Sequence, residues 1–235
     1  MKRSLIGILA SAFLALAGGA VAADRAEVTA TVLLWQEQEA GILPYASRML
    51  VTRDYLRSDA GRDDSDYLLF DRRTRQIFSV SHAQRSVLVI TADPVPAQAG
   101  PRPDIDLQVT AQADAPRIAG FVTSQVLLSS GGAECLHATV VPGLLPDVAA
   151  ALRELRGVLA GRQYRDLDKT PEELRTPCFL ANYVYAGDRH LQLGLPIQEA
   201  VSGGMRRQLQ DYRSDQTVPA ALFALPSGYE QQEMP

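Results

Sequence analysis

The sequence is poor in several features that would indicate a particular class of protein. Lysine occurs only at Lys2 and Lys169, and the formal net charge of the 235 residues is -4. A mildly acidic chain lacks the basic surface with which proteins bind nucleic acid. After the N-terminus, no run approaches the ~20 consecutive apolar residues of a membrane-spanning helix. We therefore expect a protein that binds no nucleic acid and does not span a membrane.

Motifs for catalysis and metal binding are also missing. His82, His137 and His190 are scattered, without the HxxxH or HExxH spacing that sets two ligands on one helical face. The chain has no G-x-S-x-G elbow, no Walker A sequence, and no G-x-G-x-x-G after a strand. The acidic stretch 59–66 lacks the spacing and terminal glutamate of an EF-hand loop, so a solvated turn explains it better. We expect a protein that is not an enzyme and holds no metal or cofactor.

Cys135 and Cys178 are the only cysteines. Their spacing matches neither a CxxC redox motif nor a zinc site. An even pair in an exported chain is most simply a disulfide, with two buried free thiols as the alternative. We expect the disulfide.

The N-terminus has the three parts of a secretory signal peptide. Lys2 and Arg3 give a positive start, residues 5–17 form an apolar core, and Ala20-Val21-Ala22 is an A-x-A cleavage signal. We expect a signal peptide over 1–23 and export to the periplasm, with secretion as the alternative. The remaining 24–235 fit a single β-rich domain.

Most of the mature chain has strand patterns. Between residues 55 and 91, short apolar runs rich in Val, Ile, Tyr and Phe restart every nine or ten residues, which is typical of an antiparallel meander. Further strands are predicted over 27–35, 45–52, 105–110, 120–128 and 133–141, and again in the last 30 residues. The strand over 133–141 would place Cys135 and His137 on one face.

The pattern becomes helical within an insertion at about 145–200. A helix is predicted to begin at Pro146 and end near Gly161, and a second to begin at Thr170 with Pro171 at its first position. The first helix carries one apolar stripe, which would either fill the core of the sheet or contact an apolar ligand: Val148, Leu152, Leu155 and Leu159. The predicted fold class is α+β, a curved antiparallel sheet with helices packed on its concave face.

Four short motifs lie in the predicted strands and near the C-terminus: Tyr55-Leu56-Arg57, Tyr67-Leu68-Leu69-Phe70-Asp71, Ile77-Phe78-Ser79-Val80, and Phe223 to Tyr229 with Pro226 and Gly228. Together they give the chain a resemblance to the LolA-like superfamily of periplasmic proteins, closest to a proteobacterial branch. The resemblance implies an unclosed half-barrel with helices in its concavity. In the lipoprotein carriers of that group the concavity receives acyl chains, whereas related stress regulators bind a membrane-protein partner. The late helices depart from the carriers.

Two functions are the leading hypotheses. The first is a monomeric, non-enzymatic periplasmic protein that binds an apolar ligand, a lipid or a lipoprotein acyl chain, between sheet and helix. The second is a protein-interaction module in envelope stress sensing or envelope assembly. A dry void behind the helix would favour the first, and an unpaired sheet edge or exposed apolar patch would favour the second.

Overall fold

The computed structural model describes residues 26–96 and 102–234, so the predicted signal peptide lies outside the described residues. Its twelve strands form one mostly antiparallel, unclosed sheet in the order β12-β6-β5-β4-β3-β2-β1-β11-β10-β9-β8-β7. Only β12, which pairs with β6, is parallel to its neighbour. The strands are β1 (Glu27–Gln38), β2 (Tyr45–Val51), β3 (Tyr55–Asp59), β4 (Tyr67–Asp71), β5 (Gln76–Ser81), β6 (Ser86–Ile90), β7 (Ile105–Ala111), β8 (Ser124–Ser130), β9 (Ala133–Val141), β10 (Leu195–Val201), β11 (Arg206–Pro219) and β12 (Glu230–Glu233).

The predicted meander is confirmed. β2 to β6 pair each with the next along the chain, and Asp59 to Asp66 form the connection between β3 and β4. The short apolar runs become strands because every second residue can be buried on one face. The prediction for 120–128 was wrong at its start, since β8 begins at Ser124 and the preceding residues form a separate short bridge between Ile118 and Phe121.

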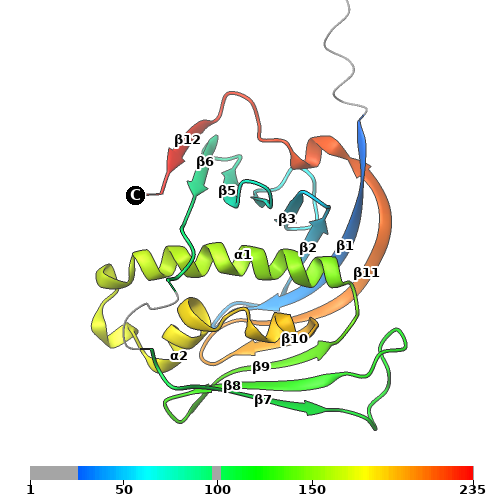
Figure 1. Ribbon diagram of the computed structural model, residues 1–235. Coiled ribbons are helices and arrows are strands. Elements are labelled where there is room, and N and C mark those ends of the chain that lie inside the picture. The colour runs from blue at the N-terminus through cyan, green and yellow to red at the C-terminus, as the bar shows by residue number, and fades with distance from the viewer. Residues whose placement is uncertain (1–25, 97–101, 235) are drawn as a thin grey trace, which may run out of the picture.

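The sheet bends around the helices, which lie inside its curve (Figure 1). α1 (Pro146–Arg165) runs across the concavity and packs against the main core cluster. That cluster joins residues of β1 and β2 to the meander and to the start of α1. Its largest members include Leu33, Trp35, Leu56, Phe70, Ile77 and Leu152. The fold is therefore α+β with sheet as its larger part.

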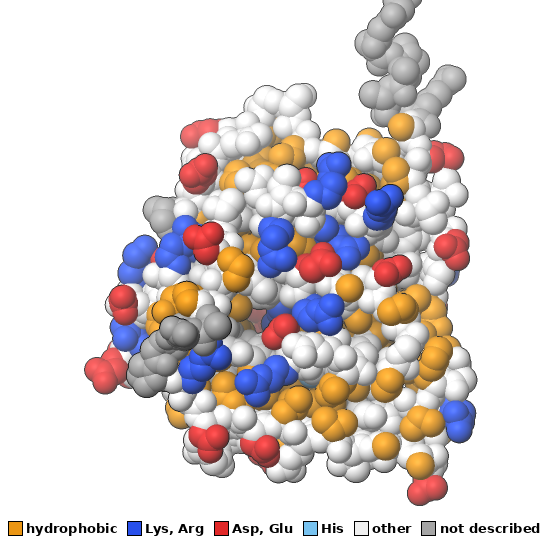
Figure 2. All heavy atoms as spheres, viewed as in Figure 1, with side chains coloured by type: hydrophobic (Ala, Val, Ile, Leu, Met, Phe, Trp, Pro, Cys, Tyr) orange, Lys and Arg blue, Asp and Glu red, His pale blue; other side chains and the backbone are white. Residues whose placement is uncertain are grey.

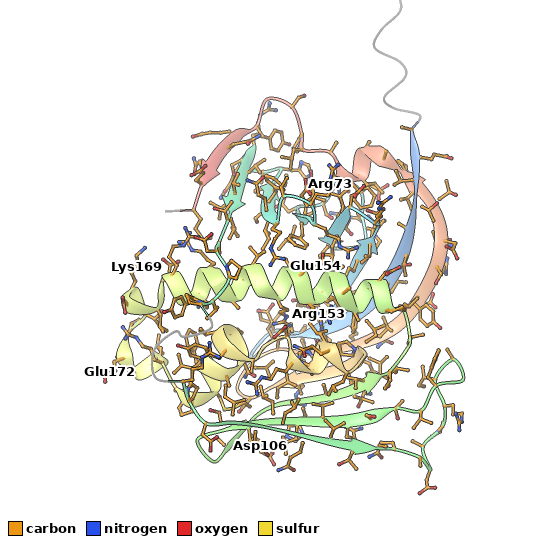
Figure 3. The ribbon with its side chains drawn as sticks, in the orientation of Figure 1. Arg73, Asp106, Arg153, Glu154, Lys169 and Glu172 are labelled. Carbon is orange, nitrogen blue, oxygen red and sulfur yellow. A yellow bond between two sulfur atoms is a disulfide. The ribbon has the colours of Figure 1, made fainter. Side chains whose placement is uncertain are left out.

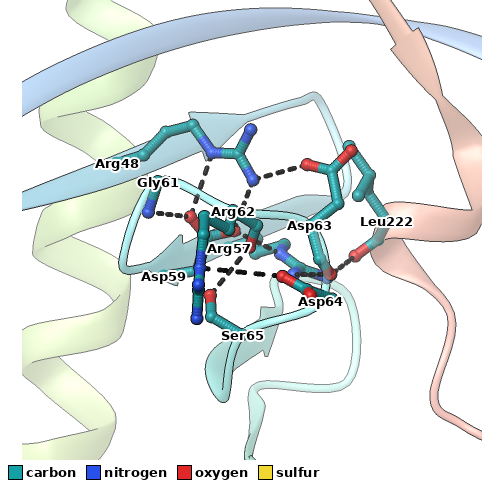
Figure 4. Close-up of polar contacts among 9 residues, drawn as sticks. All are labelled: Arg48, Arg57, Asp59, Gly61, Arg62, Asp63, Asp64, Ser65 and Leu222. Carbon is teal, nitrogen blue, oxygen red and sulfur yellow. Dashed lines mark hydrogen bonds and ion pairs between the residues drawn. The ribbon is translucent and has the colours of Figure 1, made fainter.

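The C-terminal segment covers the outer face of the meander. After β11, the 3₁₀ turn η6 (Ala220–Phe223) packs Leu222 and Phe223 against a second cluster that contains Leu50 and Leu69. The Arg57 guanidinium donates to the Leu222 carbonyl at 2.8 Å (Figure 4). The meander is consequently buried on both faces, by α1 on the inside and by this segment on the outside.

α1 begins at Pro146 as predicted, but it does not end at Gly161. The helix continues to Arg165. Gly161 is required by a close contact: a Cβ at this position would lie 2.0 Å from the Asp93 carbonyl oxygen. The glycine lets the chain after β6 cross directly against the helix. Gly161 therefore indicates a close packing contact and not the end of the helix.

The second helix begins later than predicted. Thr170 and Pro171 are followed only by a 3₁₀ turn, η3 (Glu172–Leu174), and the Thr170 hydroxyl donates to the Asp166 carbonyl. The same Thr-Pro pattern recurs six residues on, where Thr176 accepts from the Phe179 amide and α2 (Pro177–Leu180) begins. A five-residue π-helix, η4 (Ala181–Tyr185), and a 3₁₀ turn, η5 (Arg189–Gln192), complete the helical region, and Leu195 starts β10.

The predicted disulfide is confirmed: Cys135 of β9 is bonded to Cys178 of α2. Cys135 and His137 do not share a face. The register between β8 and β9 shifts beside Cys135, which is fully buried toward the helices, whereas His137 is exposed. A bulge re-aims one side chain relative to its neighbours, and here it turns the cysteine inward.

Among the described residues, no helix combines the length and the apolar character that crossing a membrane would require.

Candidate functional site

A hollow of about 320 Å³ lies beside the C-terminal half of α1. Its walls are α1, the π-helix η4, the end of β6 and Met234. Figure 2 shows that this face of the molecule is hollowed at its centre, below α1. Apolar atoms supply most of the lining surface, although five of the ten lining residues carry polar groups: Ile90, Arg156, Leu159, Ala160, Arg162, Gln163, Asn182, Tyr183, Gly187 and Met234. Apolar walls with few polar groups are typical of small-molecule sites.

The spacing of the sequence explains how α1 contributes. Arg156, Leu159, Ala160 and Gln163 follow one another at steps of three, one and three, so a helix presents them on one face. Leu159 is 37 % exposed although it continues the apolar stripe. An aliphatic side chain that projects from a helix into a lined hollow is available to a ligand.

The opposite wall is fixed to the sheet. The disulfide ties α2 to β9, and the Asn182 side-chain amide donates to the Cys135 carbonyl at 2.9 Å. The turn from Ala181 to Tyr185 is a π-helix, a form that occurs frequently at functional sites. Both tethers hold Asn182 and Tyr183 at the rim of the hollow.

A buried charged cluster lies in the same concavity, between α1 and the strands β10 and β11. The Glu199 carboxylate accepts from the Arg207 guanidinium with one oxygen and contacts the His190 ring at 2.5 Å with the other. The Arg207 guanidinium stacks on the Trp35 ring at 4.7 Å. Burial alone would raise the pKa of Glu199, but Arg207, His190 and Arg156 outweigh it and hold that pKa well below its usual range.

Hydrogen-bond donors outnumber acceptors here. Four buried side-chain atoms of the described residues have no hydrogen-bond partner, and two of them, Arg207 Nη2 and Trp35 Nε1, belong to this cluster. On the rim, Asn182 Oδ1 is likewise buried without one, because the amide nitrogen is the atom bonded to Cys135. Buried polar groups of native proteins usually find partners. Three exceptions in one concavity are typical of a site that a ligand or water completes.

The four residues of the predicted stripe have different surroundings. Val148 and Leu152 are buried in the main core cluster, and Leu155 packs against it from the side. Only Leu159 lies in the hollow. The residues that sequence reasoning missed are Arg156, His190, Glu199 and Arg207. They come from α1, η5, β10 and β11, and no spacing motif links them. The one available signal was an arginine on the side of α1 that also carries Leu159.

Two further grooves run along the outer face of the sheet. One of about 340 Å³ crosses β1, β11, β10 and β9, and its exposed side chains include Gln36, Gln198 and Gln208. Both grooves are open to solvent, and among the described residues no group of three or more His, Cys, Asp or Glu side chains could hold a metal ion. They offer water-exposed amides and no enclosed site.

Comparison with known proteins gives no family. No family model matches the sequence, and no curated protein matches it. Two solved structures are similar in outline. An uncharacterised conserved protein from Thermus thermophilus has a TM-score of 0.44 at 7% identity over 88% of this chain and 91% of that chain. PNGF-II has a TM-score of 0.44 at 9% identity over 88% of this chain, which spans 31% of that protein.

Proposed function

We propose that the protein is a non-enzymatic periplasmic binding protein of the LolA-like type, which holds an apolar ligand, a lipid or an acyl chain, between sheet and helix. The observation that carries the proposal is the hollow beside α1, where Leu159, Ile90 and Met234 present aliphatic surface between two fixed walls. The helices in the concavity of the sheet support the LolA-like part of the proposal.

The hollow lies at the C-terminal end of the apolar stripe and not along its whole length. Val148 and Leu152 fill the core, so a ligand would contact the last two turns of α1. Each methylene group that leaves water in such a site contributes ~0.8 kcal/mol. A chain of about eight buried methylenes would therefore gain roughly 6 kcal/mol before the entropy of association is subtracted.

Displacement of a fluorescent fatty acid tests the proposal with a matched pair of variants. Leu159→Trp would fill the hollow, whereas Leu174→Trp adds the same side chain at a position that is 56 % exposed and outside the lining. We expect Leu159→Trp to reduce affinity at least tenfold and Leu174→Trp to leave it unchanged. Equal binding by both variants and the wild type would refute binding in the hollow.

A partner protein in envelope stress sensing or envelope assembly is the second candidate. β7 is the last strand of the sheet, and within the described residues no strand pairs with its outer side. Val109 on this strand is 48 % exposed. An edge with an exposed apolar side chain can receive an extended peptide.

Photo-crosslinking in cells tests this second function. We expect a crosslinker at position 109 to give an adduct of discrete mass, and a crosslinker at position 174 to give none. The absence of any adduct from position 109 would exclude β7 as a docking edge.

A further inference from the structure

Arg156 is a cation without a bonded partner. It lines the hollow, and no hydrogen bond and no ion pair within the described chain joins its guanidinium to another group. Two of the other three arginines on α1 differ: Arg162 donates to the Met234 carbonyl and Arg165 to the Thr91 carbonyl. An arginine carries five N–H donors in a fixed fork, and those of Arg156, which is half-buried in the lining of the hollow, meet no acceptor within the described chain.

The charges around Arg156 leave its donors available. The charged and titratable groups that face it are Glu199, Arg207, Tyr183 and Glu37. Glu199 already uses both carboxylate oxygens, one for His190 and one for Arg207. The pKa of Arg156 is lowered, first because burial disfavours its charge and then because Arg207 repels it, although Glu199 acts in the opposite direction. An anion beside Arg156 would relieve both effects.

We propose that Arg156 binds the anionic head group of a single-chain amphiphile, a medium-chain fatty carboxylate, whose tail lies along Leu159, Ile90 and Met234. This inference rests on the proposed function and names its ligand class. A guanidinium and a carboxylate match in geometry and form charge-assisted hydrogen bonds. The unpaired Asn182 oxygen on the rim accepts hydrogen bonds and so does not compete with Arg156 for an anion.

The size of the hollow sets the length of the chain. A volume of about 320 Å³, divided by the roughly 30 Å³ that a water-sized group occupies, leaves room for about ten non-hydrogen atoms. We therefore expect affinity to rise about fourfold with each added methylene and to level off near ten carbons.

Binding of decanoate and of decan-1-ol, measured by calorimetry, tests the role of Arg156. The two molecules share a tail and differ in charge. We expect the wild type to prefer decanoate at least tenfold, since a hydrogen bond to a charged group supplies that much. Arg156→Met should lose this preference and still bind decan-1-ol. Arg153→Met, one turn away on the exposed side of α1, should behave as the wild type (Figure 3).

The outcomes separate the two proposals. If the wild type binds neither molecule, the proposed function fails. If it binds both equally, or if Arg156→Met keeps the preference, the function stands and the head-group inference is wrong. Thermal unfolding provides the fold control: an arginine without hydrogen bonds contributes little to folding, so Arg156→Met should unfold close to the wild-type temperature. Should Arg156→Met fail to fold, the ratio of the affinities for decanoate and decan-1-ol is compared between the wild type and Arg156→Lys instead. A preference for decanoate that is the same in both would show that the fork of the guanidinium is not required.

Discussion

Arg57 and Arg62 are five residues apart in one hairpin and have opposite surroundings (Figure 4). Arg57 is 2 % exposed, pairs with Asp59 at 2.8 Å, lies over the Tyr67 ring and donates to the Leu222 carbonyl. Arg62 is exposed and lies 3.7 Å from an exposed Asp64. Only the first arginine links the meander to the C-terminal segment.

Replacing each arginine by methionine should separate these roles. We expect Arg57→Met to lower the free energy of unfolding by about 3 kcal/mol, because a buried ion pair and its hydrogen bonds are broken. Arg62→Met should change it by less than about 1 kcal/mol, as exposed ion pairs do. Urea denaturation measures both. A similar loss in the two variants would contradict the structural role assigned to Arg57.

Acid should weaken the fold through Glu199. Its folded-state pKa is depressed, so it stabilises the folded state above its unfolded pKa of about 4.3 and loses that contribution as the pH falls. We expect the free energy of unfolding to decrease below about pH 5, and Glu199→Gln to show a shallower decrease from a lower starting value. Identical slopes for variant and wild type between pH 5 and pH 3 would count against this assignment.

At the scale of elements, α1 contains two glycines with different reasons to be there. A Cβ at Gly161 would lie 2.0 Å from the Asp93 carbonyl, whereas one at Gly157 would meet only the end of the Arg75 side chain at 3.3 Å. We expect Gly161→Ala to lower the free energy of unfolding by about 1–3 kcal/mol. Gly157→Ala should raise it by up to about 1 kcal/mol, because alanine favours the helix. Thermal unfolding of the two variants measures both effects. Destabilisation of both variants, or of neither, would contradict the packing explanation.

The disulfide fixes the short helical wall to β9. It closes a loop with a sequence separation of 43 residues, for which the chain-entropy relation gives about 4 kcal/mol. We expect Cys135→Ala with Cys178→Ala to lower the free energy of unfolding by roughly that amount and to weaken ligand binding, because Asn182 and Tyr183 lose a tether. Unchanged affinity in the folded double variant would show that the wall does not need the crosslink.

Sequence reasoning succeeded where the signal is local. The meander follows from alternating short runs, Pro146 marks the start of α1, and the two cysteines predict their own bond. It failed where the reason lies in a distant segment. Gly161 is needed because the Asp93 carbonyl lies against it, and the bulge at Cys135 arises from the register in which β9 pairs with β8. The Thr170 error has another cause, since two successive Thr-Pro pairs compete and only Thr176 caps a helix.

The candidate site was harder to predict than the fold. Its apolar component was visible in the stripe, of which Leu159 lines the hollow. The polar component was not, because Arg156, Glu199 and Arg207 come together only when β10 and β11 fold beside α1. No local sequence pattern predicts that charged residues far apart in the chain will be buried together.

At the scale of the whole molecule, the two halves of the sheet serve different purposes. The meander is covered on both faces and contributes to two core clusters. The half from β7 to β11 carries the disulfide, the buried carboxylate and one wall of the hollow. The hollow lies between the two halves, because Ile90 and Met234 come from the meander side, and α1 lines it as well.

Native mass spectrometry of the protein purified from the cells that produce it, followed by organic extraction, tests the central claim most directly. We predict a stoichiometric adduct that dissolves in the organic phase and is absent from Leu159→Trp purified in parallel. A protein that carries no adduct and binds no fluorescent fatty acid after purification would contradict the claim that this fold shelters an apolar ligand.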